Sequence, residues 1–294
     1  MELELRRRFF AEELEAVCRL QSPRLVDAFA AVPRERFLRA GPWTVIADSG
    51  ESAVTGATPV RTQPTPDDDP ARVYHNIAVA IDVARELFNG QPATLAIWID
   101  TLSLTPGARV LHIGAGLGYY TAVMAEAVGP GGRVVGYEVD PALAGEARRN
   151  LASRPWVEVR AGDGAEALAE HFDAVLVNAG VTHPLETWLD ALAPGGRMVL
   201  PLTATMPAMG THIGKGLVVL VTKNDAHDLG ARVVSFVAVY SAIGIRDPQM
   251  NERISKALMA GPSRWRALTR VRRDPHEPSD ACWLHGTTCC LSTL

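Results

Sequence analysis

The sequence predicts an α/β fold: a Rossmann-like, doubly wound, mostly parallel seven-stranded sheet. Apolar runs short enough to be buried strands alternate with helical stretches of about 8–12 residues, which is typical of a parallel sheet covered by helices. A glycine-rich turn joins the first of these strands to a helix, as in sheets that bind nucleotides. The 294 residues are 47% hydrophobic and 21% charged, which excludes wholesale disorder.

Residues 1–104 are predicted to form a helical, substrate-facing segment. Ser22-Pro23 supplies an N-cap and a first helical residue, and Pro33 ends the helix that they begin. The predicted helices cover Glu2–Leu20, Arg24–Val32, Asn76–Leu87 and Pro92–Leu102, and residues 41–70 are predicted to form a long irregular loop.

Residues 105–224 are predicted to form the Rossmann-like core. Its expected strands are Ala108–Ile113, Arg133–Glu138, Val157–Arg160, Phe172–Val177 and Arg197–Leu202. The expected helices between them are Tyr119–Val128, Pro141–Ala152, Ala165–Glu170 and Pro184–Leu192. Two further strands, Gly216–Thr222 and Arg232–Tyr240, have no helix between them, so we expect them to pair antiparallel. Residues 225–294 are expected to supply that final strand and a C-terminal extension packed on the sheet.

The charge and composition of the chain argue against two classes of binding partner. The net charge of -4 argues against a global electrostatic grip on nucleic acid or on an anionic membrane, and we expect neither as a partner. The N-terminal MELELRRRFF lacks the apolar stretch of a signal peptide, and no window approaches the roughly 18 apolar residues that a membrane span needs. We therefore expect a cytoplasmic protein and leave the oligomeric state open.

The glycine-rich turn reads Ile113-Gly-Ala-Gly-Leu-Gly118-Tyr-Tyr. Glycines allow close backbone approach to a ligand, and the following helix offers unpaired N–H groups at its N-terminus. The dinucleotide fingerprint needs its third glycine where this chain has Tyr119, so the spacing favours a smaller adenosine ligand over a pyrophosphate.

Two acids follow at the ends of the next strands. Glu138 ends the second strand, where a carboxylate can accept hydrogen bonds from two ribose hydroxyls, and Asp163 follows the third strand, where an acid can reach an adenine amino group. The glycine turn and the two acids together predict an adenosine-containing ligand. The predicted cofactor-binding residues are His112, Gly114, Ala115, Gly116, Gly118, Tyr119, Glu138, Val139, Gly162, Asp163, Gly164 and Asn178.

Three segments carry a more specific resemblance: SPRLVDAFAAVPRERFL with its Val-Pro-Arg, VLHIGAGLGYYTAVMA, and FDAVLVNAG…PLETWLDALAPGGRMVLPL. Together they resemble the protein-L-isoaspartate O-methyltransferase family of S-adenosylmethionine-dependent enzymes, from about Pro23 to Leu202. The resemblance implies that the cofactor is S-adenosyl-L-methionine and that the enzyme methylates a carboxylate, in a peptide, a protein or a small acid. It departs at Gly90, where the family has a serine beside the substrate carboxylate, and at His112, where an acid is common.

A carboxylate nucleophile is already ionised at neutral pH, so alignment and desolvation would suffice for its methylation. A hydroxyl or amine substrate would need a base such as histidine, and an inactive cofactor-binding protein is a further alternative. The residues predicted to face the substrate are Tyr74, His75, Asn76, Asn89, Gln91 and His183. Each also has a plain structural interpretation, as a surface histidine, a helix cap or a turn residue.

Three other features of the sequence have both a functional and a structural interpretation. Asp67-Asp68-Asp69 can bind a cation or basic substrate but is more typical of a solvated loop, and the basic stretch Arg264–Arg273 is more typical of a solvated helix face. Cys282, His285, Cys289 and Cys290, with His276 upstream, have the ligand types for zinc. Their spacing matches no standard zinc site and favours a strand with buried thiols, so we assign no metal.

Overall fold

A computed structural model describes residues 2–46, 62–166, 168–205, 212–225 and 228–294. The chain divides into two compact units, which are described separately. Unit 1 comprises residues 1–107, 115–134 and 140–159, and unit 2 comprises residues 108–114, 135–139 and 160–294. Within the described ranges, no helix combines the length and the apolar character that a membrane crossing requires.

Unit 1 is mainly helical. Its elements are α1 (Leu3–Cys18), α2 (Pro23–Ala31), η1 (Arg34–Phe37), η2 (Pro70–Val73), α4 (Pro92–Thr101), α5 (Tyr119–Val128) and α6 (Pro141–Asn150). The Ser22 side chain accepts from the Leu25 amide and so caps α2, as the sequence predicts. The Asp100 carboxylate accepts from the amides of Gln21 and Ser22, and this ties the end of α4 to the turn between α1 and α2.

A small antiparallel sheet in unit 1 corrects two sequence predictions. Its strands are β1 (Thr44–Ile46), β2 (Thr62–Pro64), β3 (Ala78–Asp82) and β4 (Leu87–Phe88), in the order β2-β1-β3-β4. The helix predicted over Asn76–Leu87 is wrong: Val79 and Ile81 alternate into the core as strand residues, and Glu86 turns the chain with a left-handed φ of 51°. The irregular loop predicted over 41–70 is wrong at its ends, which pair as β1 and β2, and residues 47–61 lie outside the described residues.

Unit 2 is organised by a ten-stranded sheet in the order β13-β14-β12-β11-β10-β9-β8-β5-β6-β7. All seven predicted strands are present: β5 (Arg109–Ile113), β6 (Arg133–Glu138), β7 (Val157–Ala161), β8 (Phe172–Val177), β9 (Leu192–Ala204), β10 (Ile213–Lys223) and β11 (Leu229–Tyr240). The first residues of β6 and β7 are counted in unit 1. Strand β8 runs parallel to β5 and β9. Strand β10 pairs antiparallel with β9 and, as predicted, with β11. The Rossmann-like fold is confirmed.

The short helix predicted over Ala165–Glu170 is wrong, because none of the described residues in that range is helical. Trp188 Nε1 and Thr187 Oγ1 donate to the carbonyls of Gly164 and Ala165, at 2.7 and 3.1 Å. These bonds take the acceptors that a first helical turn would use. The donors come from α7 (Glu186–Ala191), which the sequence does predict.

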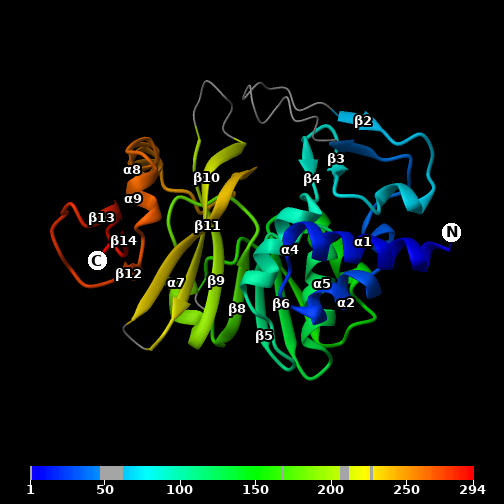
Figure 1. Cartoon of the computed structure of the whole chain (residues 1–294), viewed down its shortest axis with the longest axis horizontal. Helices are drawn as coiled ribbons and strands as arrows, with labels where there is room; N and C mark the ends of the chain where they lie inside the picture. The colour runs from blue at the N-terminus through cyan, green and yellow to red at the C-terminus, as the bar shows by residue number, and fades with distance from the viewer. Residues whose placement is uncertain (1, 47–61, 167, 206–211, 226–227) are drawn as a thin grey trace. The chain divides into compact units, whose positions relative to one another are not determined.

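The C-terminal extension adds the other three strands, β12 (Arg270–Arg272), β13 (Cys282–His285) and β14 (Cys290–Ser292). It also supplies α8 (Pro248–Met259) and α9 (Pro262–Arg266), and α8 lies beside these strands in Figure 1. Val271, Leu284 and Leu291 are buried in the core that the sheet covers. The predicted boundary at 224/225 falls between β10 and β11, which are hydrogen-bonded partners, so the extension continues the sheet. The three-part domain division stays a prediction.

Candidate active site at the strand ends

Unit 2 brings the predicted cofactor residues together at the ends of β5, β6, β7 and β8. The Gly114 amide donates to the Tyr137 carbonyl at 2.9 Å, and the Gly162 amide donates to the Glu138 carbonyl at 2.9 Å. The Asn178 amide donates to the Ile113 carbonyl at 2.8 Å. Backbone hydrogen bonds therefore link all four strand ends at the edge where such sheets bind ligands.

Two glycines at this edge are required by the backbone. Gly114 has a φ of +82°, and a Cβ there would lie 3.0 Å from the Asn178 carbonyl oxygen. Gly164 has a φ of +68°, and a Cβ there would lie 2.5 Å from Cδ1 of Ile113. Any side chain would be strained by the left-handed conformation and would push these strand ends apart.

The carboxylates of Glu138 and Asp163 follow neighbouring strands. Glu138 is buried, with 7% exposure, whereas Val139 beside it is an exposed apolar side chain. Asp163 is half-buried and its Oδ1 accepts from the Ala165 amide at 3.0 Å. A buried acid, an exposed apolar side chain and a second acid provide the groups that a ribose and an adenine ring need.

In unit 1 the glycine turn continues as Ala115, Gly116 and Gly118 before α5 begins at Tyr119. Gly118 has a φ of +95°, and a Cβ there would lie 2.9 Å from Cδ1 of Leu151. A Cβ at Gly116 would meet only Cδ1 of Ile81, at 3.4 Å. Protein packing therefore does not fill the space beside Gly116, and α5 presents N–H groups of its first turn there. This backbone cradle fits the carboxylate end of S-adenosylmethionine.

His112 lies inside the sheet. It sits on β5 opposite Leu176, is fully buried, and burial lowers its pKa to about 3. The side chain is therefore neutral at physiological pH, and it presents no charge to a ligand.

On the predicted substrate side, Arg34 of the Val-Pro-Arg segment organises unit 1. Its guanidinium is fully buried and donates to the carbonyls of Val73, His75 and Ile77, at 2.6, 3.1 and 2.7 Å. It also donates to Asn89 Oδ1 at 3.4 Å, and that oxygen accepts from the Val79 amide at 2.9 Å. The sequence signal for Arg34 was the family resemblance, but its role as the hub of the 73–77 segment was missed.

The remaining predicted substrate residues in unit 1 take mostly structural roles. Asn76 Oδ1 accepts from the Ala93 amide at 2.8 Å, and Gln91 Nε2 donates to the Asn76 carbonyl at 3.3 Å, so both fix the start of α4. Tyr74 is buried and donates to Glu35, and burial, then Glu35, raise its pKa. His75 is exposed. Gly90 has a φ of +80°, which a serine would adopt only under strain.

In unit 2, His183 lies on the segment that follows β8, half-buried, with Nδ1 2.9 Å from Thr182 Oγ1. Burial lowers its pKa, partly offset by Asp247. The segment 241–247 also reaches this edge, because a Cβ at Gly244 would lie 3.1 Å from Asp163 Oδ2. Arg246 anchors the segment by donating to the carbonyls of Gly180 and Thr203, at 2.7 and 2.8 Å. Sequence reasoning missed this contribution, because no motif marks it.

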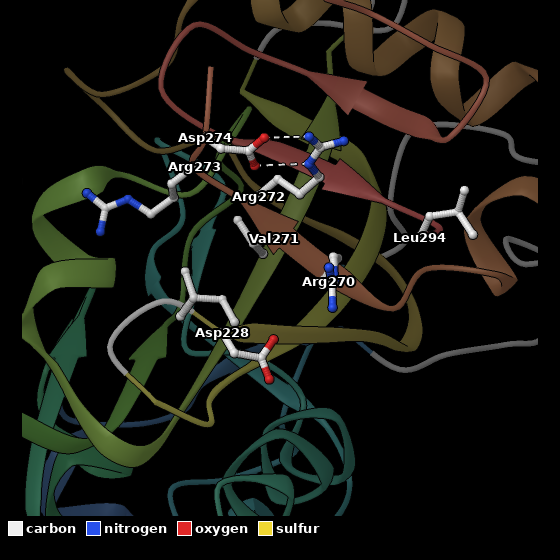
Figure 2. A pocket seen from close by; sticks show the side chains of 8 residues that line it. Asp228, Arg270, Val271, Arg272, Arg273, Asp274 and Leu294 are labelled. Atoms are coloured by element: carbon white, nitrogen blue, oxygen red, sulfur yellow. Dashed lines mark hydrogen bonds and ion pairs between the residues drawn. The ribbon is translucent and has the colours of Figure 1, made fainter. Parts of the chain in front are cut away.

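A cavity of about 810 Å³ lies elsewhere in unit 2, against β12 (Figure 2). No predicted site residue lines it. Two of the three arginines that line it have acidic partners: Arg272 pairs with Asp274, and Arg273 pairs with Asp190 at 2.6 Å. In unit 1 the acidic run is likewise structural, since Asp67 pairs with Arg72 and Asp69 caps η2.

The strand-end acids, the glycine cradle and the sheet order define a class I S-adenosylmethionine-dependent methyltransferase. The sequence profile of the protein-L-isoaspartate(D-aspartate) O-methyltransferase family matches residues 60–224. The chain belongs to this family. S-adenosylmethionine is thereby confirmed as its cofactor.

Individual relatives agree. The chain is 30% identical over 239 residues to the protein-L-isoaspartate O-methyltransferase of Methanothrix thermoacetophila, an alignment that covers 80% of this chain and 96% of that protein. It is 32% identical over 196 residues to the protein-L-isoaspartate O-methyltransferase of Methanopyrus kandleri, an alignment that covers 65% of this chain and 74% of that protein. A solved protein-L-isoaspartate O-methyltransferase is similar in fold, with a TM-score of 0.60 and 24% identity, covering 84% of this chain and 69% of that one. A Plasmodium falciparum structure in complex with S-adenosyl-L-homocysteine is also similar in fold, with a TM-score of 0.59 and 16% identity. That match covers 80% of this chain and 97% of the other.

Proposed function

We propose that this enzyme methylates a side-chain or main-chain carboxylate of a protein or peptide, with isoaspartyl residues as the first substrate to test. The observation that carries the proposal is the family match across the whole strand-end site, together with relatives named for this activity. A cytoplasmic location stays a prediction from the sequence.

The cofactor residues have distinct roles in this proposal. S-adenosylmethionine, when bound, supplies an electrophilic methyl group. Glu138 would accept hydrogen bonds from the ribose, and Asp163 and Val139 would contact the adenine. Asn178 borders the glycine turn, with its Nδ2 3.5 Å from the Gly114 carbonyl oxygen. The turn glycines Gly114, Gly116 and Gly118, with Ala115 and Tyr119, would hold the amino-acid end, and Gly162 and Gly164 would let the end of β7 approach the adenine.

On the substrate side, the segments around His75-Asn76 and Asn89-Gln91 would form the peptide-binding edge. Their backbone is fixed by Arg34 and by the Asn76–Ala93 hydrogen bond, so substrate would meet a preorganised surface. Peptide carbonyls and amides can pair with the exposed Asn76 and with the half-buried Gln91. Preorganisation of this kind lowers the entropy cost of alignment.

A carboxylate substrate needs no proton removed before in-line attack on the methyl group. The residues of this chain then act by alignment and by excluding water, and the rate should be flat between pH 6 and 8. One residue favours the competing hypothesis, in which a histidine base activates a hydroxyl or amine substrate. His183 is half-buried beside the strand-end edge, and its lowered pKa keeps the imidazole neutral at pH 7.

The test is methyl transfer from labelled cofactor to two peptides that differ only in an isoaspartyl or an aspartyl residue. We expect base-labile label on the isoaspartyl peptide alone, with a pH-independent rate that survives in His183→Gln. A rate that rises with pH and is abolished by His183→Gln would replace the carboxylate proposal with the histidine-base one. Cofactor binding without transfer to either peptide or to extract proteins would indicate an inactive cofactor-binding protein.

A further inference from the structure

The C-terminal extension gathers four metal-ligating side chains far from any predicted cofactor residue in the sequence. They are His276, Cys282, His285 and Cys290, and one ligand atom from each lies within 4.8 Å of all the others. All four belong to unit 2. They form an H-x5-C-x2-H-x4-C pattern, which has no standard zinc spacing and therefore gave no clear sequence signal.

A β-bulge explains how Cys282 and His285 come to share a face. Residues three apart on a regular strand point to opposite faces. Here β13 pairs with β14 as Cys282↔Ser292, Leu284↔Leu291 and His285↔Cys290, with a register shift between Cys282 and Leu284. The extra residue restores the parity, so Cys282, His285 and Cys290 lie on one face. Leu284 and Leu291 point to the other face, into the core.

His276 reaches the same face from the segment between β12 and β13, which contains no helix or strand from Arg273 to Ala281. Its Nε2 lies 3.6 Å from Cys282 Sγ, and its ring centroid lies 4.8 Å from that of His285. Tetrahedral zinc, at its usual bond lengths to nitrogen and sulfur, holds ligand atoms about 3.3–3.8 Å apart. The Nε2–Sγ separation is already within that range.

The outer contacts also suit a metal. His276 Nδ1 lies 2.8 Å from the Asp274 carbonyl oxygen, an arrangement that leaves Nε2 as the ligand atom. Asp274 is in turn paired with Arg272, as the dashed lines in Figure 2 show. The Ser279 amide donates to Cys282 Sγ at 3.4 Å. His285 Nδ1 is buried, and no hydrogen-bond partner for it occurs among the described residues.

The two thiols are poised differently. Burial raises the pKa of Cys282, but hydrogen bonds from Ser279, Cys290 and His276 outweigh it and lower the pKa to about 6. Burial, then the neighbouring Cys282 sulfur, raise the pKa of Cys290 to about 12. Zinc binding would displace the protons of both thiols, so the site does not require either thiol to be ionised beforehand.

We propose that His276, Cys282, His285 and Cys290 form a structural zinc site that fastens the segment between β12 and β13 to the β13–β14 hairpin. Two thiolates and two neutral imidazoles give Zn²⁺ a closed, charge-neutral tetrahedral shell with no open position for catalysis. The proposal does not rest on the methyltransferase activity, because the ligands are separate from every residue assigned to it.

The experiment measures the zinc content of the full-length chain, purified under reducing conditions from zinc-supplemented medium. We expect about one zinc per chain in the natural protein and a loss of at least tenfold in the double variant Cys282→Ser/His285→Ala. Cys18→Ser and His171→Ala are matched controls, because they remove one thiol and one exposed imidazole outside the cluster, and both should keep their zinc.

Cobalt substitution in the natural chain removes the dependence on variants that fold poorly. A tetrahedral cobalt spectrum with sulfur-to-cobalt charge transfer is expected, and chelation should expose residues 273–281 to protease. Zinc-free protein that binds no cobalt, equal zinc in the double variant, or a Cys282–Cys290 disulfide in freshly reduced and zinc-treated protein would overturn the proposal. Methyl-transfer assays test the proposed methyltransferase function independently, so the zinc proposal and the functional proposal can fail separately.

Discussion

Arg34→Met is the perturbation that tests how the substrate edge is held. Methionine keeps most of the buried volume of arginine but removes every donor. The carbonyls of Val73 and Ile77, which accept from the guanidinium at 2.6 and 2.7 Å, would lose a charged partner in a buried site. The carbonyl of His75 and the side chain of Asn89 would lose longer bonds.

The magnitude follows from these four bonds. A hydrogen bond to a charged group contributes about 1.5–3 kcal/mol, and unsatisfied buried acceptors add about 1–3 kcal/mol each. The contributions are not additive, because the four acceptors share one donor group. The two short bonds to Val73 and Ile77 dominate, and from them we expect Arg34→Met to lower the free energy of unfolding by about 3–5 kcal/mol. Arg34→Lys should lose less, since an ammonium keeps donors but not the planar fork.

The assay is urea unfolding of the natural chain and both variants, with peptide KM and cofactor Kd measured where the variant is folded. Arg36→Met is the matched control: this exposed neighbour should change the unfolding free energy by less than about 0.5 kcal/mol. We expect Arg34→Lys to raise the peptide KM and leave the cofactor Kd unchanged. If Arg34→Met costs no more than Arg36→Met, the 73–77 segment is held by something else and the reasoning fails.

Three further predictions concern single residues. Glu138→Gln should weaken cofactor binding about 10- to 100-fold, measured by calorimetry, because a charged acceptor is lost. Glu158→Gln on β7 is the control and should leave the cofactor affinity unchanged. If both variants bind the cofactor equally well, Glu138 does not bind the ribose. Gly90→Ser should lower the unfolding free energy by about 1–2 kcal/mol without increasing isoaspartyl activity, since φ is +80° and its Cβ would lie 2.9 Å from Leu95 Cδ2. Gly129→Ser is the control, because Gly129 has a φ of +71° but a Cβ there would meet no atom within 4 Å. It therefore measures the cost of the left-handed backbone without the clash with Leu95. Burial lowers the pKa of His112 to about 3, so between pH 6.5 and this value the side chain binds a proton only in the unfolded state. The free energy of unfolding should therefore fall as pH falls through this window, by up to about 5 kcal/mol. His112→Gln should flatten this acid limb, and an unchanged slope would contradict the burial argument.

The Rossmann-like core was predictable from the sequence because its signals are local. Strand β8 and helix α5 begin and end at the predicted residues, since apolar runs and glycine breaks mark both ends. The region 76–88 was not predictable in the same way. Ala, Arg, Glu and Leu there favour a helix locally, but pairing of β3 with β1 buries Val79 and Ile81. Tertiary pairing overrode the local preference.

The residues of the candidate site were likewise predictable only where the sequence signal is local. Glycines and acids at strand ends could be placed from spacing alone, because consecutive parallel strands end at one edge. Arg34 and Arg246 bond to segments tens of residues away in the sequence, so no local spacing encodes their roles. The four residues of the proposed zinc site are close in sequence, but their spacing matches no standard zinc site. The cluster adds a further condition, because it exists only if one bulge shifts the register of β13 against β14. A regular strand would turn Cys282 and His285 to opposite faces and leave two isolated side chains, so the bulge is the feature on which the proposed zinc site depends.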